Sequence, residues 1–216
     1  DLLLEDTNYR NSEITNLIQG AKFYKINNAL ASNLIAKNYS VLSIGVKISG
    51  TEYVLDLVNS ESMFLDANII TTDGDELSVN NIDVVHYKGV IRGEDKSLVA
   101  LSITPKEVSG FISGSIGNYA VGKIENGTEN IIYPDKEITK DLKFSCDTFD
   151  ESPKSFGYET KTAKNGVSYL DKCVKLSYYT EYDMYTTLGS DTDVLLYMTM
   201  VHNQISTLYA NENIRT

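Results

Sequence analysis

The feature that most constrains this fold is a succession of short alternating segments between residues 39 and 135. Apolar side chains recur at Val41, Ile44, Val46 and Ile48 before the turn Ser49-Gly50. Tyr53, Leu55 and Leu57 then alternate with Val54, Asp56 and Val58, and residues 82–91 are rich in β-branched side chains. Asn126-Gly127 is the strongest short hairpin signal in the chain. Further strands are predicted at residues 98–103, 108–112, 119–124 and 130–133. Strands this close together pair antiparallel, so the sequence predicts a mainly β fold, either a sandwich or a rolled sheet.

Two segments flank this β region. Residues 1–38 are predicted to be helical or mixed, with two consecutive helices, the first capped by Ser12 or Thr15 and reaching Phe23. Residues 136–171 are polar and carry few periodic apolar positions. We therefore expect them to form an extended linker or arm.

A different pattern begins at residue 172. Residues 173–180 alternate as a strand, and Ser190 then caps a helix with Asp193 three residues further on. Apolar side chains recur along this helix in a stripe typical of a buried face: Val194, Tyr197, Met198, Val201, Ile205 and Leu208. Ile214 is predicted to begin another strand. Residues 172–216 therefore resemble the opening of an α/β domain, which they do not complete.

The charge of the chain excludes one class of partner. Its formal net charge is −11, and its arginines are Arg10, Arg92 and Arg215. Phosphate binding needs a basic face, so we expect no nucleic-acid partner. No apolar run approaches the roughly 18 residues of a membrane-spanning helix, so we expect no membrane span.

The chain offers few residues for catalysis. It has no His-Glu-x-x-His motif, no Cys-x-x-Cys pair and no phosphate-binding loop. His86 lies in a predicted strand, where we expect a partly exposed position, and His202 lies beside the apolar stripe as a boundary residue. A zinc site within the chain would need both histidines, a cysteine and a carboxylate to converge from distant segments. Asp66, Asp73 and Asp75 match the spacing of no defined calcium loop.

Cys146 and Cys173 are the two cysteines of the chain, which are too few for a disulfide scaffold. They pair with each other or remain free, and both states stay open. Cys146 lies in the polar arm, from which an exposed thiol can reach another domain. A thiolate in the fourth position of a catalytic zinc displaces the water that the metal must activate. Cys146 is therefore the candidate inhibitory zinc ligand.

Two regions, in this order, resemble the reprolysin (adamalysin-type) zinc metallopeptidases, which are metzincins. Residues 85–93 followed by 97–102 contain Tyr-Lys-Gly-Val-Ile-Arg-Gly and Ser-Leu-Val-Ala-Leu-Ser. Prodomains of the family carry a Tyr-x-Gly-x-(Val/Ile)-x-Gly stretch followed by Ser-x-Val-Ala-Leu-Ser. Residues 53–57, 63–64 and 72–75 are similar to the strands that precede this motif.

The second region is similar to the first strand and first helix of the family's catalytic domain. It comprises residues 173–176, 183–185 and 208–214. The resemblance covers about residues 50–216. Lys175 stands where the family has a calcium-binding Glu, which argues against that calcium site. The few arginines and the many lysines and asparagines hint at a bacterial member of the family.

The resemblance implies a secreted zymogen with four segments. These are an N-terminal segment (1–38), a β prodomain core (39–135), an inhibitory arm (136–171) and the start of the catalytic domain (172–216). The prodomain would assist the folding of its own catalytic domain and inhibit it, with Cys146 capping the zinc. The zinc would be held by a His-Glu-x-x-His-x-x-Gly-x-x-His helix that this chain does not contain. The chain alone is therefore expected to be inactive towards the protein substrates of the parent enzyme.

Two other functions compete with this interpretation. One is a secreted β-sandwich adhesion or carbohydrate-binding module that uses a surface bearing some of the 15 tyrosines. The other is a structural domain whose second unit only supports the first. Replacement of Cys146 separates them, because only a latent protease would respond to it.

Overall fold

The computed structural model describes residues 1–216 except 61–63, 65–66, 126 and 139–171. Its strands are β1 (Leu3–Glu5), β2 (Lys22–Ile26), β3 (Val41–Ile48), β4 (Thr51–Asn59), β5 (Ile69–Ile70), β6 (Glu76–Leu77), β7 (Val85–Ile91), β8 (Glu94–Ile103), β9 (Val108–Gly114), β10 (Gly117–Lys123), β11 (Asn130–Pro134), β12 (Lys172–Cys173) and β13 (Ile214–Arg215). Its α-helices are α1 (Ser12–Leu17), α2 (Asn28–Lys37), α3 (Tyr182–Leu188) and α4 (Asp191–Asn211).

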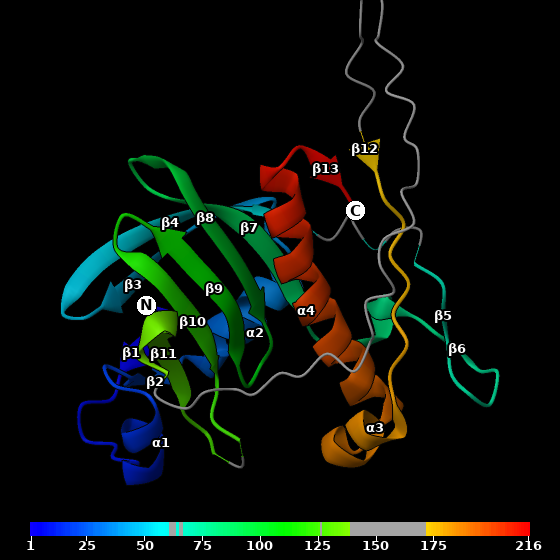
Figure 1. The fold of residues 1–216 in the computed structure, drawn as a ribbon, viewed down its shortest axis with the longest axis horizontal. Helices are drawn as coiled ribbons and strands as arrows, with labels where there is room; N and C mark the ends of the chain where they lie inside the picture. The colour runs from blue at the N-terminus through cyan, green and yellow to red at the C-terminus, as the bar shows by residue number, and fades with distance from the viewer. Residues whose placement is uncertain (61–63, 65–66, 126, 139–171) are drawn as a thin grey trace, which may run out of the picture.

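Nine strands form one antiparallel sheet in the order β1-β2-β11-β10-β9-β8-β7-β4-β3. The sheet rolls up so that β3 and β4 cross the strands β8 to β11, and it is nearly closed (Figure 1). Side chains of β1 and β2, at one end of the sheet, contact β3 at the other end. The Tyr24 hydroxyl donates to the Lys47 carbonyl, and Lys47 Nζ lies 3.5 Å from a Glu5 oxygen. This confirms the mainly β prediction, and of the two expected forms it is the rolled sheet.

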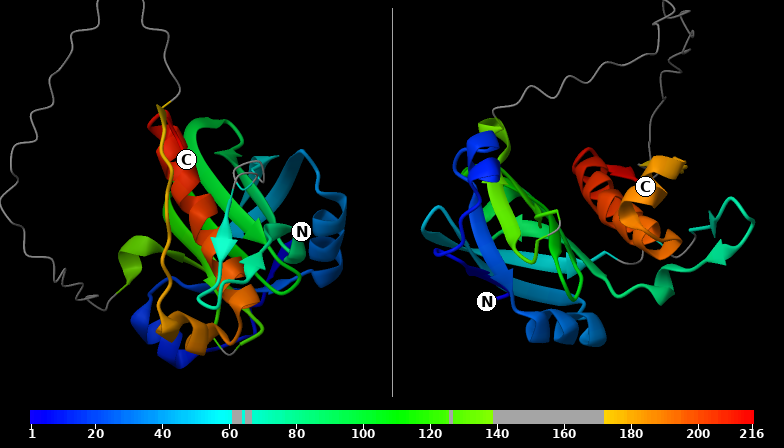
Figure 2. Two further views of the ribbon diagram at one scale, coloured as in Figure 1. Left: turned by 90° about the vertical axis from the view of Figure 1, so that its right-hand side faces the viewer. Right: turned by 90° about the horizontal axis from the view of Figure 1, so that it is seen from below.

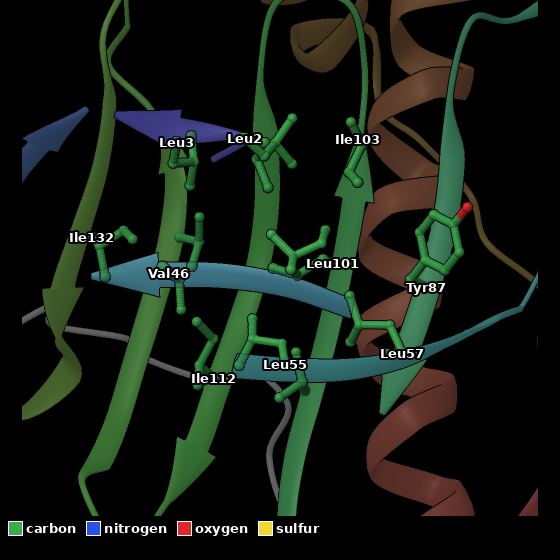
Figure 3. Packing of buried hydrophobic residues seen from close by; sticks show 14 of the residues in the cluster. Leu2, Leu3, Val46, Leu55, Leu57, Tyr87, Leu101, Ile103, Ile112 and Ile132 are labelled. Carbon is green, nitrogen blue, oxygen red and sulfur yellow. The ribbon is translucent and has the colours of Figure 1, made fainter. Parts of the chain in front are cut away.

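The main hydrophobic core lies inside this roll. Leu55 and Leu57 project from β4 towards Leu101 and Ile112 of the strands that β4 crosses (Figure 3). All four are at most 4% exposed. Alternate residues of each strand therefore fill the interior, and their neighbours face outward, as the pleat of a sheet requires.

The N-terminal segment differs from the prediction. α2 is confirmed, and its N-cap Asn27 accepts from the Leu30 amide at 3.1 Å. The helix predicted to reach Phe23 is wrong, because α1 ends at Leu17 and the chain continues as β2. Phe23 joins a second apolar cluster with Ile131, its pairing partner on β11. Strand pairing at the sheet edge thus overrides the local helical spacing.

The C-terminal unit packs against the outside of the roll. α4 lies across β7, β8 and β9, as the views in Figure 2 show. Ser190 caps α4 as predicted and accepts from the Asp193 amide at 3.1 Å. Residue 214 begins β13 as predicted, and β13 pairs in parallel with β12.

The strand expected over residues 173–180 is wrong beyond Cys173, since residues 174–180 have no regular structure. Within the described part of the chain this segment has no strand to pair with. Its Tyr178 hydroxyl instead lies 2.8 Å from His202 Nδ1 on α4. The described residues therefore do not form the β-α start of a metzincin domain as the sequence predicted it.

Candidate functional site

A mostly polar cluster lies where α4 covers the outer face of the sheet. We call it the α4 joint, and its members are Ser60, Phe64, His86, Ser102, Tyr178, His202 and Asn203. The pleat explains its position. Tyr87 and Leu101 fill the core, so the neighbouring residues His86 and Ser102, which pair across β7 and β8, face α4.

Asn203 is the centre of the α4 joint and is fully buried. Its Nδ2 lies 3.3 Å from the Tyr87 carbonyl and 3.2 Å from the Leu101 carbonyl, and also 3.2 Å from Ser102 Oγ. Its Oδ1 accepts from Ser60 Oγ at 2.8 Å. One amide side chain therefore binds α4 to β7, to β8 and to the segment that follows β4.

His86 is 2% exposed, so the expectation of a partly exposed strand position is wrong. The reason is tertiary, because α4 and Phe64 cover this part of the sheet. His86 Nδ1 lies 2.8 Å from Ser102 Oγ. Burial, and then the proximity of His202, lowers the pKa of His86 from 6.5 to about 3. His86 is therefore neutral at pH 7.

His202 is half-buried, as expected of a boundary residue. The Phe64 ring lies 5.1 Å from the His86 ring and 5.3 Å from the His202 ring, centroid to centroid. Burial lowers the pKa of His202 as well. The fold thus brings together two histidines that are 116 positions apart in the sequence.

The apolar stripe of α4 is not the face that packs on the sheet. The buried side chains are Leu195, Thr199, Met200, Asn203, Ser206 and Thr207. At about 100° per residue they lie opposite the stripe, whose Tyr197 and Leu208 are 42% and 51% exposed. The expected orientation is therefore wrong. The sheet presents the small residues Ala100 and Ser102 and backbone carbonyls, which suit a polar helix face that donates hydrogen bonds.

The α4 joint holds the C-terminal unit on the sheet through hydrogen bonds. Ser102 is fully buried, so its hydroxyl is not available to a substrate. No group of three or more metal-binding side chains occurs among the described residues. What the joint offers chemically is a set of buried hydrogen bonds centred on Asn203, beside the buried His86 and the half-buried His202.

The candidate inhibitory ligand Cys146 lies within residues 139–171, outside the described part of the chain. The structure describes only the backbone of Cys173, at the end of β12. The zinc-ligand role of Cys146 and its pairing with Cys173 therefore remain predictions. The exposed Asp73 and Asp75 lie in the turn between β5 and β6.

Sequence reasoning did not single out Ser102 or Asn203. A signal for Ser102 was available, because the predicted hairpin of β7 and β8 makes it the pairing partner of His86. Asn203 could be recognised only as a polar residue opposite the apolar stripe, which is also the usual pattern of a solvated face.

Comparison of the chain with protein-family models, with curated proteins and with solved structures found no match. Among the helices of the described residues, none is long and apolar enough to cross a membrane.

Proposed function

We propose that this chain is the prodomain and the opening of the catalytic domain of a secreted zinc metalloendopeptidase zymogen, and that it helps that enzyme to fold and holds it inactive. The observation that carries the proposal is the two-sided packing of α4. Its polar face is bound to the rolled sheet, and its apolar stripe is left partly exposed. An apolar stripe of this kind marks a surface that packs against a further unit.

The parallel pair β12 and β13 supports the same conclusion. Each strand has two residues, and the pair is separate from the nine-stranded sheet. Parallel sheets are normally larger and covered on both faces, and an isolated pair of short strands is unstable in water. We infer that β12, α4 and β13 are one edge of a larger α/β sheet, of which α4 covers one face.

The prodomain motif has a structural explanation in the β7–β8 hairpin. A Cβ atom at Gly89 would lie 2.0 Å from the Asp56 carbonyl oxygen, so only glycine allows β4 and β7 to approach this closely. Ser97 Oγ accepts from the Ile91 amide at 2.7 Å and donates to the Glu94 carbonyl at 2.6 Å. These motif residues stabilise the strands to which α4 binds.

The described residues do not fit a zinc site, so peptide-bond hydrolysis is assigned to the part of the protein that lies outside this chain. Cys146 is the proposed contribution of the chain to that metal, as an inhibitory ligand supplied from the arm 136–171. The resident zinc would polarise the scissile carbonyl and activate water.

We expect Cys146→Ser to release activity. In the full-length product of the gene, this variant should hydrolyse a quenched peptide without prior processing, and the wild type should stay latent, because a serine hydroxyl is a far poorer zinc ligand than a thiolate. Cys173→Ser is the matched control and should remain latent. Equal activity of both variants, or latency of both after zinc loading is confirmed by metal analysis, contradicts the proposed role of Cys146.

A carbohydrate-binding module is the second candidate function, and one observation favours it. Tyr179 and Tyr182 are 95% and 75% exposed, and the rings of Tyr182 and Tyr185 stack at 5.9 Å. Exposed aromatic rings of this kind are typical of binding surfaces. If this candidate holds, Tyr182→Ala abolishes binding on a glycan array and Cys146→Ser does not change it.

A further inference from the structure

We propose that the α4 joint is a proton-sensitive latch: in mild acid α4 leaves the sheet while the rolled sheet stays folded. This holds for any function of the C-terminal unit and does not depend on the proposed peptidase. Both histidines of the chain, His86 and His202, are members of the joint. Proton uptake by histidine is therefore confined to this one interface.

The surroundings of the two histidines favour their neutral forms. His86 faces Ser102 on β8, Phe64 and, on α4, His202. His202 faces Tyr178, whose own pKa is raised by burial and then by Tyr209. None of the described carboxylates contributes to the pKa shift of either histidine. Among the described residues, a positive charge on one ring would therefore meet the other ring and neutral groups, and no carboxylate lies in place to balance it.

The sign of the pH effect follows from these pKa shifts. The pKa of an exposed histidine is 6.5, and that of docked His86 is about 3. Between these values the open form binds a proton that the docked form excludes, so acid favours opening. The docked state is most stable above pH 6.5, and for each histidine that stays neutral the opening equilibrium rises by about tenfold per pH unit below it.

The rolled sheet is expected to resist the same acid. Arg92 and Ser43 hold the pKa of Asp56 at about 2, and Ser115 lowers the pKa of Glu94. Burial raises the pKa of Glu107, so that group is not a source of acid instability. The core inside the roll is apolar. Between pH 6.5 and about 3, where the two histidines bind protons, the sheet therefore loses few of its ionic interactions.

Hydrogen exchange followed by mass spectrometry on the full chain tests this inference. Protection of α4 and of β10–β11, on which α4 does not pack, is measured from pH 7.5 to 4.5 and corrected for the intrinsic exchange rate. We expect the opening of α4 to rise between about 10- and 100-fold per pH unit below pH 6, for one or two protons. Protection of β10 and β11 should stay constant. Loss of protection in both regions together, or a pH-independent α4, overturns the proposal.

Neutral replacements identify the proton-binding groups. His86→Gln and His202→Gln should each reduce the pH dependence of α4 opening by up to one proton, because glutamine keeps hydrogen-bonding capacity and cannot be protonated here. An unchanged pH dependence in both variants contradicts the latch. If His86→Gln leaves α4 undocked at pH 7.5, the His202→Gln variant and the number of protons bound by the wild type decide the question.

Discussion

Gly110→Ala should strongly destabilise the rolled sheet. Gly110 lies on β9 opposite Leu101, and a Cβ atom there would lie 1.9 Å from the Ala100 carbonyl oxygen. Its φ is +152°, a conformation that residues with a side chain rarely adopt. Relief of the clash requires β8 and β9 to separate beneath α4. We expect a loss of at least about 4 kcal/mol in the free energy of unfolding, measured by urea denaturation.

Gly122→Ala is the matched control for this variant. Gly122 lies on the neighbouring strand β10, and an added Cβ atom would meet nothing within 4 Å. Alanine there should change the free energy of unfolding by no more than about 1 kcal/mol, with stabilisation expected because alanine restricts the unfolded chain. Similar stabilities for the two alanine variants would contradict the strand geometry described at Gly110.

Asn203→Ala should detach α4 from the sheet without unfolding the sheet. The substitution removes the donor that lies near the Tyr87 and Leu101 carbonyls and the acceptor for Ser60 Oγ. It leaves these polar groups beneath the helix without that partner. We expect the docking of α4 to weaken by about 2–3 kcal/mol, which hydrogen exchange of α4 reports as a rise in opening of about 30- to 150-fold.

Gln204→Ala separates this effect from a general loss of helix stability. Gln204 is the next residue of α4, and its side chain makes one long contact, of 3.4 Å, with the Met200 carbonyl. Its replacement should change α4 protection by less than about 0.5 kcal/mol. If Asn203→Ala behaves like Gln204→Ala, Asn203 is not the residue that binds α4 to the sheet.

The sequence was sufficient to predict the strands of the sheet between residues 39 and 135, because their signals are local, but not β1 and β2. Alternation located β3 and β4, and Asn126-Gly127 identified the hairpin of β10 and β11. Side chains two positions apart on a strand lie on the same face of the sheet. Leu55 and Leu57 were therefore predictable as a pair on one face, and both belong to the core. Ser190 was recognisable as a cap for a similar reason, since a cap acts within one helical turn.

The errors occur where a distant segment decides the local structure. Phe23 was predicted to lie in a helix, but it pairs with Ile131 of β11 and therefore lies in a strand. Coverage by α4 buries His86, and a single strand gives no sign of what will cover its outer face. The orientation of α4 was wrong for the same reason, because hydrophobic periodicity assumes one apolar neighbour. In the proposed zymogen, the apolar stripe packs against a second neighbour, the rest of the catalytic domain, and the polar face packs on the rolled sheet.

The two faces of α4 suit the two roles proposed for it, in the pH-dependent joint and in the zymogen. The polar face of α4 is bound to the sheet through Asn203, and the neutral His86 lies beneath the helix. The apolar stripe is suited to a permanent core. In the proposed zymogen, a helix with these two faces would keep the prodomain on the enzyme until the pH falls and would then remain with the enzyme.

The most direct test of the proposed function is to read the coding sequence beyond Thr216. The account predicts that the same reading frame continues into a domain with a His-Glu-x-x-His-x-x-Gly-x-x-His motif, in which two histidines one helical turn apart and a third after a tight turn hold zinc. A frame that ends soon after Thr216, or continues without this motif, contradicts the peptidase assignment.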